Sequence, residues 1–238
     1  MSFDEDVIVA DPLLVEAIAE RRETLHRRIA ELVDRDVRVV CVTKGHPPVV
    51  AASAIAAGFS DLGENYAQEL RDKAAALDAV AALDAVGAEG SPSPRWHFIG
   101  TLQTNKVRLV AGVVDLWHTI DRPSLAEQVA RRAPGASVLV QLDLAGLPGR
   151  GGCLPEHAPE LVARCRELGL DVRGLMGVGP PGEPEDARAG FRLLDRTATE
   201  LGLDERSIGM SADLEVALEE GATILRIGTA LVGPRPQR

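Results

Sequence analysis

Short, nearly continuous apolar runs recur along the chain from residue 37 onward, bounded by glycine, proline or aspartate. Runs of this kind are typical of strands that are buried on both faces. The pattern predicts strands at residues 37–43, 59–63, 96–100, 115–120, 138–142, 172–178, 207–210 and 223–227. Segments with a helical pattern separate them, at residues 48–57, 66–82, 103–112, 123–133, 155–169, 184–201 and 212–220.

A longer amphipathic segment precedes the first strand. Arginine and glutamate fill one of its faces, and the apolar residues of the other face recur at helical spacing: Leu14, Ile18, Leu25, Ile29 and Leu32. The spacing therefore predicts one N-terminal helix over residues 12–36.

Eight strands that alternate with helices predict a parallel (β/α)8 barrel of the TIM type, and the chain length fits the roughly 250 residues that such a barrel uses. The competing topology is an open doubly wound sheet, which holds a dinucleotide through a glycine-rich turn after its first strand. Residues 42–47, Val-Thr-Lys-Gly-His-Pro, lack that GxGxxG pattern. We therefore expect an α/β fold in which residues 1–238 form a single barrel domain with an extra N-terminal helix.

The charge balance and the residue types exclude several function classes. The 36 acidic and 26 basic side chains give a formal charge of −10, which disfavours binding to nucleic acid. Two Trp, one Tyr and four Phe are too few for base-stacking platforms. No apolar run approaches the roughly 18 residues of a membrane span. Three cysteines without metal-like spacing, and an acidic N-terminus without a signal-peptide pattern, predict a cytoplasmic protein.

Candidate chemistry begins with Lys44, which follows the first predicted strand. Function in such barrels sits at the carboxyl ends of the strands, so the amine would enter a partly desolvated barrel mouth. Desolvation lowers the pKa of an ammonium group, and a neutral amine is suited to attack an aldehyde. The alternative is a lysine that only extends from a strand end to solvent.

The last two strands predict an anion site. Ser211 would cap the helix after strand seven, while Gly228 and Thr229 follow strand eight with a close backbone approach and a hydroxyl. Phosphate sites in barrels are often built from these two loops. The alternative is that Ser211 is only an N-cap and Gly228 only a turn.

Further candidates lie in or directly after other buried strands. Arg226, inside strand eight, needs a partner that offsets its desolvation, either a ligand or a structural carboxylate. Asn65 follows strand two, and His97 and Met176 lie within strands three and six, where a core histidine and barrel packing are the simpler interpretations. The remaining histidines show no metal-ligand spacing: His26, His46, His118 and His157.

An amine at the first strand, a phosphate cradle at the last two strands and a cation between them suit pyridoxal 5′-phosphate. A site for this cofactor needs a Schiff-base lysine and a partner for the pyridine nitrogen. The aldehyde would join Lys44, the phosphate would contact Ser211 and Thr229, and Arg226 would face the ring nitrogen. A phosphosugar-type barrel enzyme without a cofactor is another interpretation of the same residues.

At these residues the sequence resembles the pyridoxal phosphate homeostasis protein family. The motifs run in order from about residue 42 to residue 230, so the resemblance covers nearly the whole chain. The matching segments are Val42-Thr43-Lys44, Gly63-Glu64-Asn65-Tyr66, Trp96-His97-Phe98-Ile99-Gly100, Leu102-Gln103-Thr104-Asn105-Lys106, Arg173-Gly174-Leu175-Met176, Gly209-Met210-Ser211-Ala212-Asp213-Leu214 and Arg226-Ile227-Gly228-Thr229-Ala230.

The resemblance implies a barrel like the N-terminal domain of alanine racemase, with pyridoxal 5′-phosphate held as a Schiff base on Lys44. It implies a role in intracellular homeostasis of the cofactor, by buffering it or delivering it to apo forms of enzymes that use it, without clear catalytic turnover. An amino-acid racemase-like enzyme is the alternative, and we expect a monomer or a weak dimer. The cofactor-binding candidates are then Lys44, Asn65, His97, Met176, Ser211, Arg226, Gly228 and Thr229.

Two positions depart from the family pattern. His46 stands where the family often has a second lysine, and Arg150 lies near the place of a lysine that is usual in the loop after strand five. Any transfer of the cofactor through accessory lysines is therefore in question for this chain.

Overall fold

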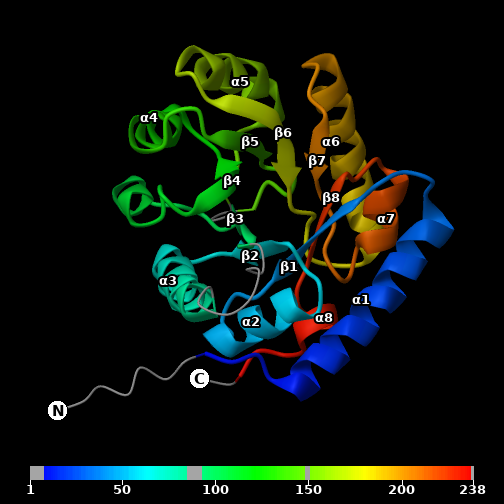
Figure 1. The fold of residues 1–238 in the computed structure, drawn as a ribbon. Helices are drawn as coiled ribbons and strands as arrows, with labels where there is room; N and C mark the ends of the chain where they lie inside the picture. Colours follow the sequence, from blue (N-terminus) through cyan, green and yellow to red (C-terminus); the bar gives the residue numbers. More distant parts are fainter. Residues whose placement is uncertain (1–7, 85–92, 148–150, 237–238) are drawn as a thin grey trace.

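The computed structural model describes residues 8–84, 93–147 and 151–236, and its eight parallel strands close into a barrel (Figure 1). The strands are neighbours in sequence order, and β8 pairs back onto β1. This confirms the predicted (β/α)8 fold. The strands are β1 (Arg38–Val42), β2 (Asp61–Glu64), β3 (Arg95–Phe98), β4 (Val114–Ile120), β5 (Ser137–Leu142), β6 (Asp171–Gly177), β7 (Glu205–Ser207) and β8 (Ile224–Ile227).

Helices cover the outside of the barrel, and α1 runs along α7 and α8 (Figure 1). None of the helices in the described ranges is long and apolar enough to cross a membrane. The α-helices are α1 (Pro12–Leu32), α2 (Pro48–Ala56), α3 (Ala67–Asp84), α4 (Pro123–Arg132), α5 (Ala158–Glu167), α6 (Arg188–Glu200), α7 (Leu214–Glu219) and α8 (Thr229–Val232). Three 3-10 helices are η1 (Thr104–Leu109), η2 (Pro155–His157) and η3 (Pro184–Ala187).

The N-terminal helix α1 is shorter than the predicted segment 12–36. Its start is capped by the Asp11 carboxylate, which accepts hydrogen bonds from two amides of the first turn. It ends at Leu32, because Val33 adopts an extended backbone and the Arg35 guanidinium donates to a carbonyl at the end of α7. A tertiary contact thus replaces the last predicted helical turn.

Other elements also differ from the sequence pattern. The segment 103–112 contains the 3-10 helix η1 in place of an α-helix, and α8 was not predicted at all. The seventh strand lies at Glu205–Ser207 instead of 207–210, because the chain turns at Gly209 with φ of 91°. A Cβ at this glycine would lie 2.5 Å from Cβ of Ala217, so the turn requires glycine.

Apolar side chains pack on both sides of the strands, in a larger layer outside the barrel and a smaller layer inside it. The larger one packs the strands against the helices and includes the fully buried Trp117, Phe98 and Phe191. The smaller one fills the barrel interior with Val40, Leu116, Leu139, Met176 and Ile224. Buried polar side chains also occupy barrel strands: Asp61, His97, His118, Ser207 and Arg226. Burying a polar or charged group without a partner costs free energy, so the hydrogen bonds of these five side chains matter for the stability of the barrel.

Candidate functional site

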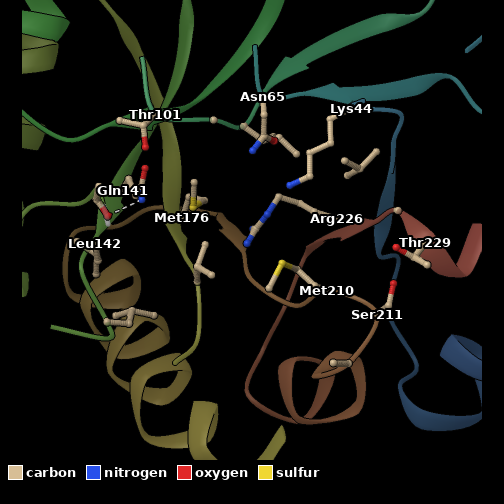
Figure 2. Close-up of a pocket in the computed structure, with 18 of the residues that line it drawn as sticks. Lys44, Asn65, Thr101, Gln141, Leu142, Met176, Met210, Ser211, Arg226 and Thr229 are labelled. Carbon is tan, nitrogen blue, oxygen red and sulfur yellow. Dashed lines mark hydrogen bonds between the residues drawn. The ribbon is translucent and has the colours of Figure 1, made fainter. Parts of the chain in front are cut away.

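A cavity of about 630 Å³ opens at the carboxyl ends of the strands, where barrels of this type hold their ligands (Figure 2). It brings together residues that are far apart in sequence, from the ends of β1, β2 and β6, from β8, and from the loops after β7 and β8. Seven of the eight residues selected from the sequence line it: Lys44, Asn65, Met176, Ser211, Arg226, Gly228 and Thr229.

Lys44 is placed by a tight turn directly after β1. Gly45 adopts a left-handed backbone with φ of 74°, and its amide donates to Glu69 Oε1 at 2.7 Å. The amide of His46 donates to the Thr43 carbonyl at 3.1 Å. These bonds fix the turn, and the Lys44 side chain enters the cavity (Figure 2).

The amine of Lys44 is free to react. It has no hydrogen bond or ion pair with any residue in the described part of the chain. Burial, followed by the positive charges of Arg235 and Arg226, lowers its pKa, although Glu64 opposes the shift. A larger share of the amine is therefore neutral and nucleophilic near neutral pH than for a lysine in water.

A second lysine, Lys73, lies beneath the same turn, and its ammonium group is hydrogen-bonded to three oxygens of the protein. Lys73 is 2% exposed, and its Nζ donates to Glu64 Oε1 at 2.6 Å and to the Thr43 carbonyl at 2.7 Å. A third bond of 3.2 Å reaches Glu69, the residue that also holds the turn. Lys73 therefore supports the Lys44 turn, and its amine does not face a ligand.

Arg226 brings a buried guanidinium to the cavity, where the negative charge of Asp213 opposes part of the effect of burial on its pKa. Its Nη1 donates to the carbonyl and the hydroxyl of Ser207, at 2.6 and 2.7 Å, and its Nη2 donates to the Gly177 carbonyl at 2.9 Å. No ion pair with a described carboxylate accompanies these bonds, and burial lowers the pKa of the guanidinium to about 10. Three of its five N–H donors are used, so two remain for a ligand acceptor.

The hydroxyls of Ser211 and Thr229 point toward one another at one side of the cavity (Figure 2). The expectation that Ser211 caps the next helix is wrong, because α7 begins two residues later than predicted and its N-cap is Asp213. The Asp213 carboxylate instead accepts a bond from the Met210 amide at 2.6 Å. Ser211 is thus left in the loop, and neither hydroxyl bonds to another described residue.

His97 is the one candidate that does not line the cavity. Its ring is 1% exposed, and its two nitrogens contact Asp61 Oδ1 and His118 Nε2, each at 2.8 Å. His97 was expected to contact the cofactor, but its side chain instead belongs to a hydrogen-bond network among the strands.

Sequence reasoning missed several residues that line the cavity. Gln141 and Asp143 lie at the end of β5 and directly after it, a position that the strand-end rule itself would have selected. Thr101 follows β3 in the same way. Arg235 gave no signal, because it comes after the last strand and reaches the cavity only through the fold.

Two of the residues that line the cavity carry a buried oxygen without a hydrogen-bond partner among the described residues, Asn65 Oδ1 and Gln141 Oε1. The amide nitrogen of Gln141 donates to the Gly151 carbonyl at 2.6 Å, which fixes the orientation of that side chain. Unpaired buried acceptors are rare in folded proteins, and both of these lie on residues that line the cavity.

The two departures from the family pattern have different outcomes. His46 is buried beside the Lys44 turn and does not line the cavity; burial, followed by the charges of Lys73 and Arg235, lowers its pKa. Arg150 lies outside the described residues. Within the described ranges, no group of three or more His, Cys, Asp and Glu side chains is placed to hold a metal ion.

The donor set of the cavity suits a phosphorylated aldehyde that also carries an acceptor nitrogen. Lys44 offers an amine of lowered pKa, Ser211 and Thr229 offer hydroxyls to an anion, and Arg226 offers spare N–H donors. Met176 adds a buried apolar wall beside them.

Comparisons with known proteins agree on one family. Residues 15–236 match the family described as alanine racemase, N-terminal domain. A pyridoxal phosphate homeostasis protein of Pseudomonas aeruginosa is 37% identical over 220 residues, which are 88% of this chain and 90% of that protein. PipY of Synechococcus elongatus, in its structure with PLP bound, is 32% identical with a TM-score of 0.77 over 91% of this chain and 100% of that chain.

An alanine racemase of Clostridium difficile shares the fold alone, at 15% identity and a TM-score of 0.69 over 93% of this chain and 58% of that chain. The match over nearly the whole chain and the identity to the curated relatives confirm the resemblance found in the motifs. The chain belongs to the alanine racemase N-terminal domain family and, within it, to the pyridoxal phosphate homeostasis proteins.

Proposed function

We propose that this protein binds pyridoxal 5′-phosphate as a Schiff base on Lys44 and acts in homeostasis of the cofactor, by holding it and releasing it to apo enzymes in the cytoplasm. The observation that carries the proposal is the cavity itself, which is lined by the half-buried amine of Lys44 and the buried guanidinium of Arg226, neither with an ion pair in the described residues. The relatives that bear the name of this function support it.

Each end of the cofactor has suitable partners in the cavity. The phosphate accepts hydrogen bonds from the Ser211 and Thr229 hydroxyls, and Gly228 leaves the backbone beside them accessible. Arg226 meets the ring nitrogen with its spare donors. Asn65 lines the same cavity, and the apolar side chain of Met176 would pack against the ring.

The covalent step needs only Lys44. The Lys44 amine would form a carbon–nitrogen double bond with the aldehyde carbon, and the carbonyl oxygen would leave as water. The cofactor supplies an aldehyde for this bond and, in enzymes, an electron sink. Reversal by water or by a free amine releases it, which suits a protein that buffers and delivers.

Arg226 disfavours strong catalysis in this arrangement. A guanidinium donates hydrogen bonds and carries positive charge, and both effects oppose a proton on a neighbouring ring nitrogen. An unprotonated ring withdraws electrons weakly. The residues that hold the cofactor thus favour storage over turnover.

A reduction experiment tests the attachment point. The purified protein, loaded with pyridoxal 5′-phosphate, should absorb in the visible, lose that band on treatment with borohydride and carry the pyridoxyl group on Lys44. The sequence has three lysines, so peptide mapping is unambiguous. Lys44→Ala should abolish the band, whereas Lys106→Ala, the matched control on η1, should retain it. An adduct mainly on Lys73 or Lys106 would overturn the assignment.

Isotope exchange tests the racemase-like alternative. Alanine, serine and ornithine are incubated with the loaded protein in deuterated water, and deuterium at the α-carbon is measured for wild type and Arg226→Glu. We expect very slow or no exchange in the wild type. Exchange on the order of 1–10³ per second, the range of ordinary enzymes, would favour the enzyme.

A further inference from the structure

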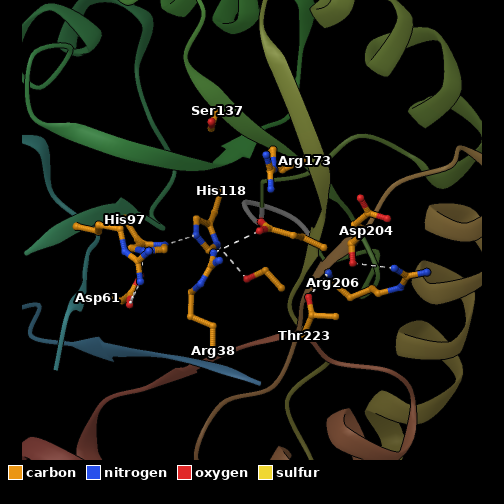
Figure 3. Close-up of polar contacts among 12 residues, drawn as sticks. Arg38, Asp61, His97, His118, Ser137, Arg173, Asp204, Arg206 and Thr223 are labelled. Carbon is orange, nitrogen blue, oxygen red and sulfur yellow. Dashed lines mark hydrogen bonds and ion pairs between the residues drawn. The ribbon is translucent and has the colours of Figure 1, made fainter. Parts of the chain in front are cut away.

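A continuous chain of buried polar side chains links the cavity to Asp61 on β2. Arg226 Nη1 lies 2.7 Å from Ser207 Oγ, which lies 2.9 Å from His118 Nδ1. His118 Nε2 lies 2.8 Å from His97 Nδ1, and His97 Nε2 lies 2.8 Å from Asp61 Oδ1. Figure 3 shows His97 between His118 and Asp61, with dashed lines to both. All five residues are less than 5% exposed, so water does not interrupt the chain.

The far end of this chain is anchored near the surface. Asp61 Oδ2 accepts bonds from Ser60 Oγ and Arg95 Nη2, both at 2.7 Å, and the Arg95 side chain is 55% exposed. Burial opposes ionisation of Asp61, but hydrogen bonds from His97, Arg95 and Ser60 hold the pKa of its carboxyl below the usual range. Asp61 therefore carries a negative charge at neutral pH.

The chemistry of the groups sets one direction along the chain. A guanidinium only donates hydrogen bonds, so Ser207 Oγ accepts one from Arg226. The Ser207 hydroxyl in turn donates a hydrogen bond to His118 Nδ1. His118 then donates from Nε2 to His97, and His97 donates from Nε2 to Asp61. In this order each donor meets one acceptor, and both rings are neutral Nε2–H tautomers.

The opposite order fits the contacts less well. It requires an imidazolium at His97 and directs two donors at the Ser207 oxygen, whose hydrogen then has no acceptor in the described part of the chain. Burial lowers the pKa of His118 well below its usual value, and the positive charges of Arg226 and Arg38 act in the same direction, so that ring is neutral.

The direction matters for Arg226 because this guanidinium has no ion pair among the described residues. Hydrogen bonds in a low-dielectric interior polarise one another, so the charge of Asp61 strengthens each bond up to Ser207. The chain therefore offsets part of the cost of burying Arg226 and restricts its rotation, while its remaining donors stay directed at the cavity.

We propose that Asp61, His97, His118 and Ser207 form a positioning relay that holds Arg226 against an aromatic acceptor nitrogen in the cavity. The proposal rests on the proposed function, since it names the residues that orient a group toward the cofactor. None of these four residues lines the cavity, so each would act on the ligand only through Arg226.

The protonation pattern is tested on the cofactor-free protein by correlating nitrogen and hydrogen resonances of the histidine side chains. We expect His97 and His118 to be neutral Nε2–H tautomers at neutral pH, assigned with His97→Gln and His118→Gln. Addition of pyridoxal 5′-phosphate should shift both sets of resonances and leave the exposed His157 unchanged. An imidazolium at His97, or resonances that do not respond, would overturn the relay.

The positioning role is tested with a ligand pair. Wild type, Ser207→Ala and Asp61→Asn are titrated with pyridoxal 5′-phosphate and with an analogue in which a C–H group replaces the ring nitrogen. We expect the wild type to prefer the natural cofactor, Ser207→Ala to reduce that preference by about tenfold, and Asp61→Asn to reduce it by less. Ser53→Ala is the matched control, since Ser53 is equally buried but bonds within and beside α2.

Failure of the proposed function and failure of the relay give different results in these experiments. A wild type that does not bind pyridoxal 5′-phosphate would reject the proposed function itself. A wild type that binds it, with a preference for the ring nitrogen that survives Ser207→Ala, would reject the relay alone. Equal changes in Ser53→Ala and Ser207→Ala would show a general loss of packing and would also reject it.

Discussion

The two ends of the barrel treat buried charge differently. At the amino end, charges are matched, as in the ion pair of Arg38 with Glu205 at 3.3 Å (Figure 3). At the carboxyl end, Lys44 and Arg226 line one cavity without an ion pair in the described residues. Burying an unmatched charge costs free energy, and a ligand that supplies the missing partner offsets the cost. The carboxyl end is therefore the end at which we propose that the ligand binds.

The same contrast separates two lysines of one small region. Lys73 has three oxygen partners within 3.2 Å, whereas the amine of Lys44 has none among the described residues. Partners rather than depth decide the role, because both side chains are at least partly buried. The paired ammonium of Lys73 stabilises the fold, whereas the unpaired amine of Lys44 is the one that we propose binds a ligand.

The largest expected effect comes from breaking the paired lysine. Lys73→Met leaves the fully buried Glu64 without its ammonium and should lower the free energy of unfolding by about 3–5 kcal/mol, measured by urea denaturation. The double variant Lys73→Met with Glu64→Leu should lose less, because no charge is then stranded. A single variant within about 0.5 kcal/mol of wild type would contradict the contrast between the two lysines.

A smaller effect is expected at the anion end of the cavity. Ser211→Ala removes one hydroxyl donor to a dianion and should weaken binding of pyridoxal 5′-phosphate by about 10- to 100-fold, at roughly 1.4 kcal/mol per factor of ten. Pyridoxal without phosphate should be nearly insensitive to the same change. Equal losses for both ligands, measured by titration, would show that Ser211 acts on the loop and not on the phosphate.

The smallest effect concerns the charge that Arg235 places near Lys44. Its positive charge is the second cause of the lowered pKa of the Lys44 amine, so Arg235→Ala should raise that pKa. The pH profile of the reaction with pyridoxal 5′-phosphate should then move to higher pH, because deprotonation to the reactive amine occurs later. High salt should produce a similar shift in the wild type, since Arg235 is exposed and its field is screened. A profile that moves to lower pH, or not at all, would exclude this influence.

Much of the fold followed from local patterns. Apolar runs predicted all eight strands, and the alternation with helices predicted their closure, because strands buried on both faces leave few other arrangements. Boundaries were less certain. Leu32 ends α1 because Arg35 finds carbonyls of a distant helix, and Gly209 ends β7 because Ala217 packs against it. Neither contact is visible in a local window.

The candidate site followed the same division. The strand-end rule selected Lys44, Ser211 and Thr229, because the carboxyl ends of parallel strands meet at one face of a barrel. It also selected His97, whose side chain lies among the strands and not in the cavity. The position of a residue along a strand gives only its approximate height in the barrel. Whether its side chain lines the cavity or lies among the strands depends on its hydrogen-bond partners.

The sequence by itself determined the class of fold and the family, and it selected Lys44 as the candidate lysine, because these depend on periodic patterns and on short motifs in order. Only the tertiary structure decided which charges are paired. Lys73 became structural, Arg235 joined the cavity from the far end of the chain, and Arg226 was tied through Ser207 to a network that reaches Asp61. The physical reason is that the environment of a charge depends on partners far apart in sequence, which come together only when the barrel closes.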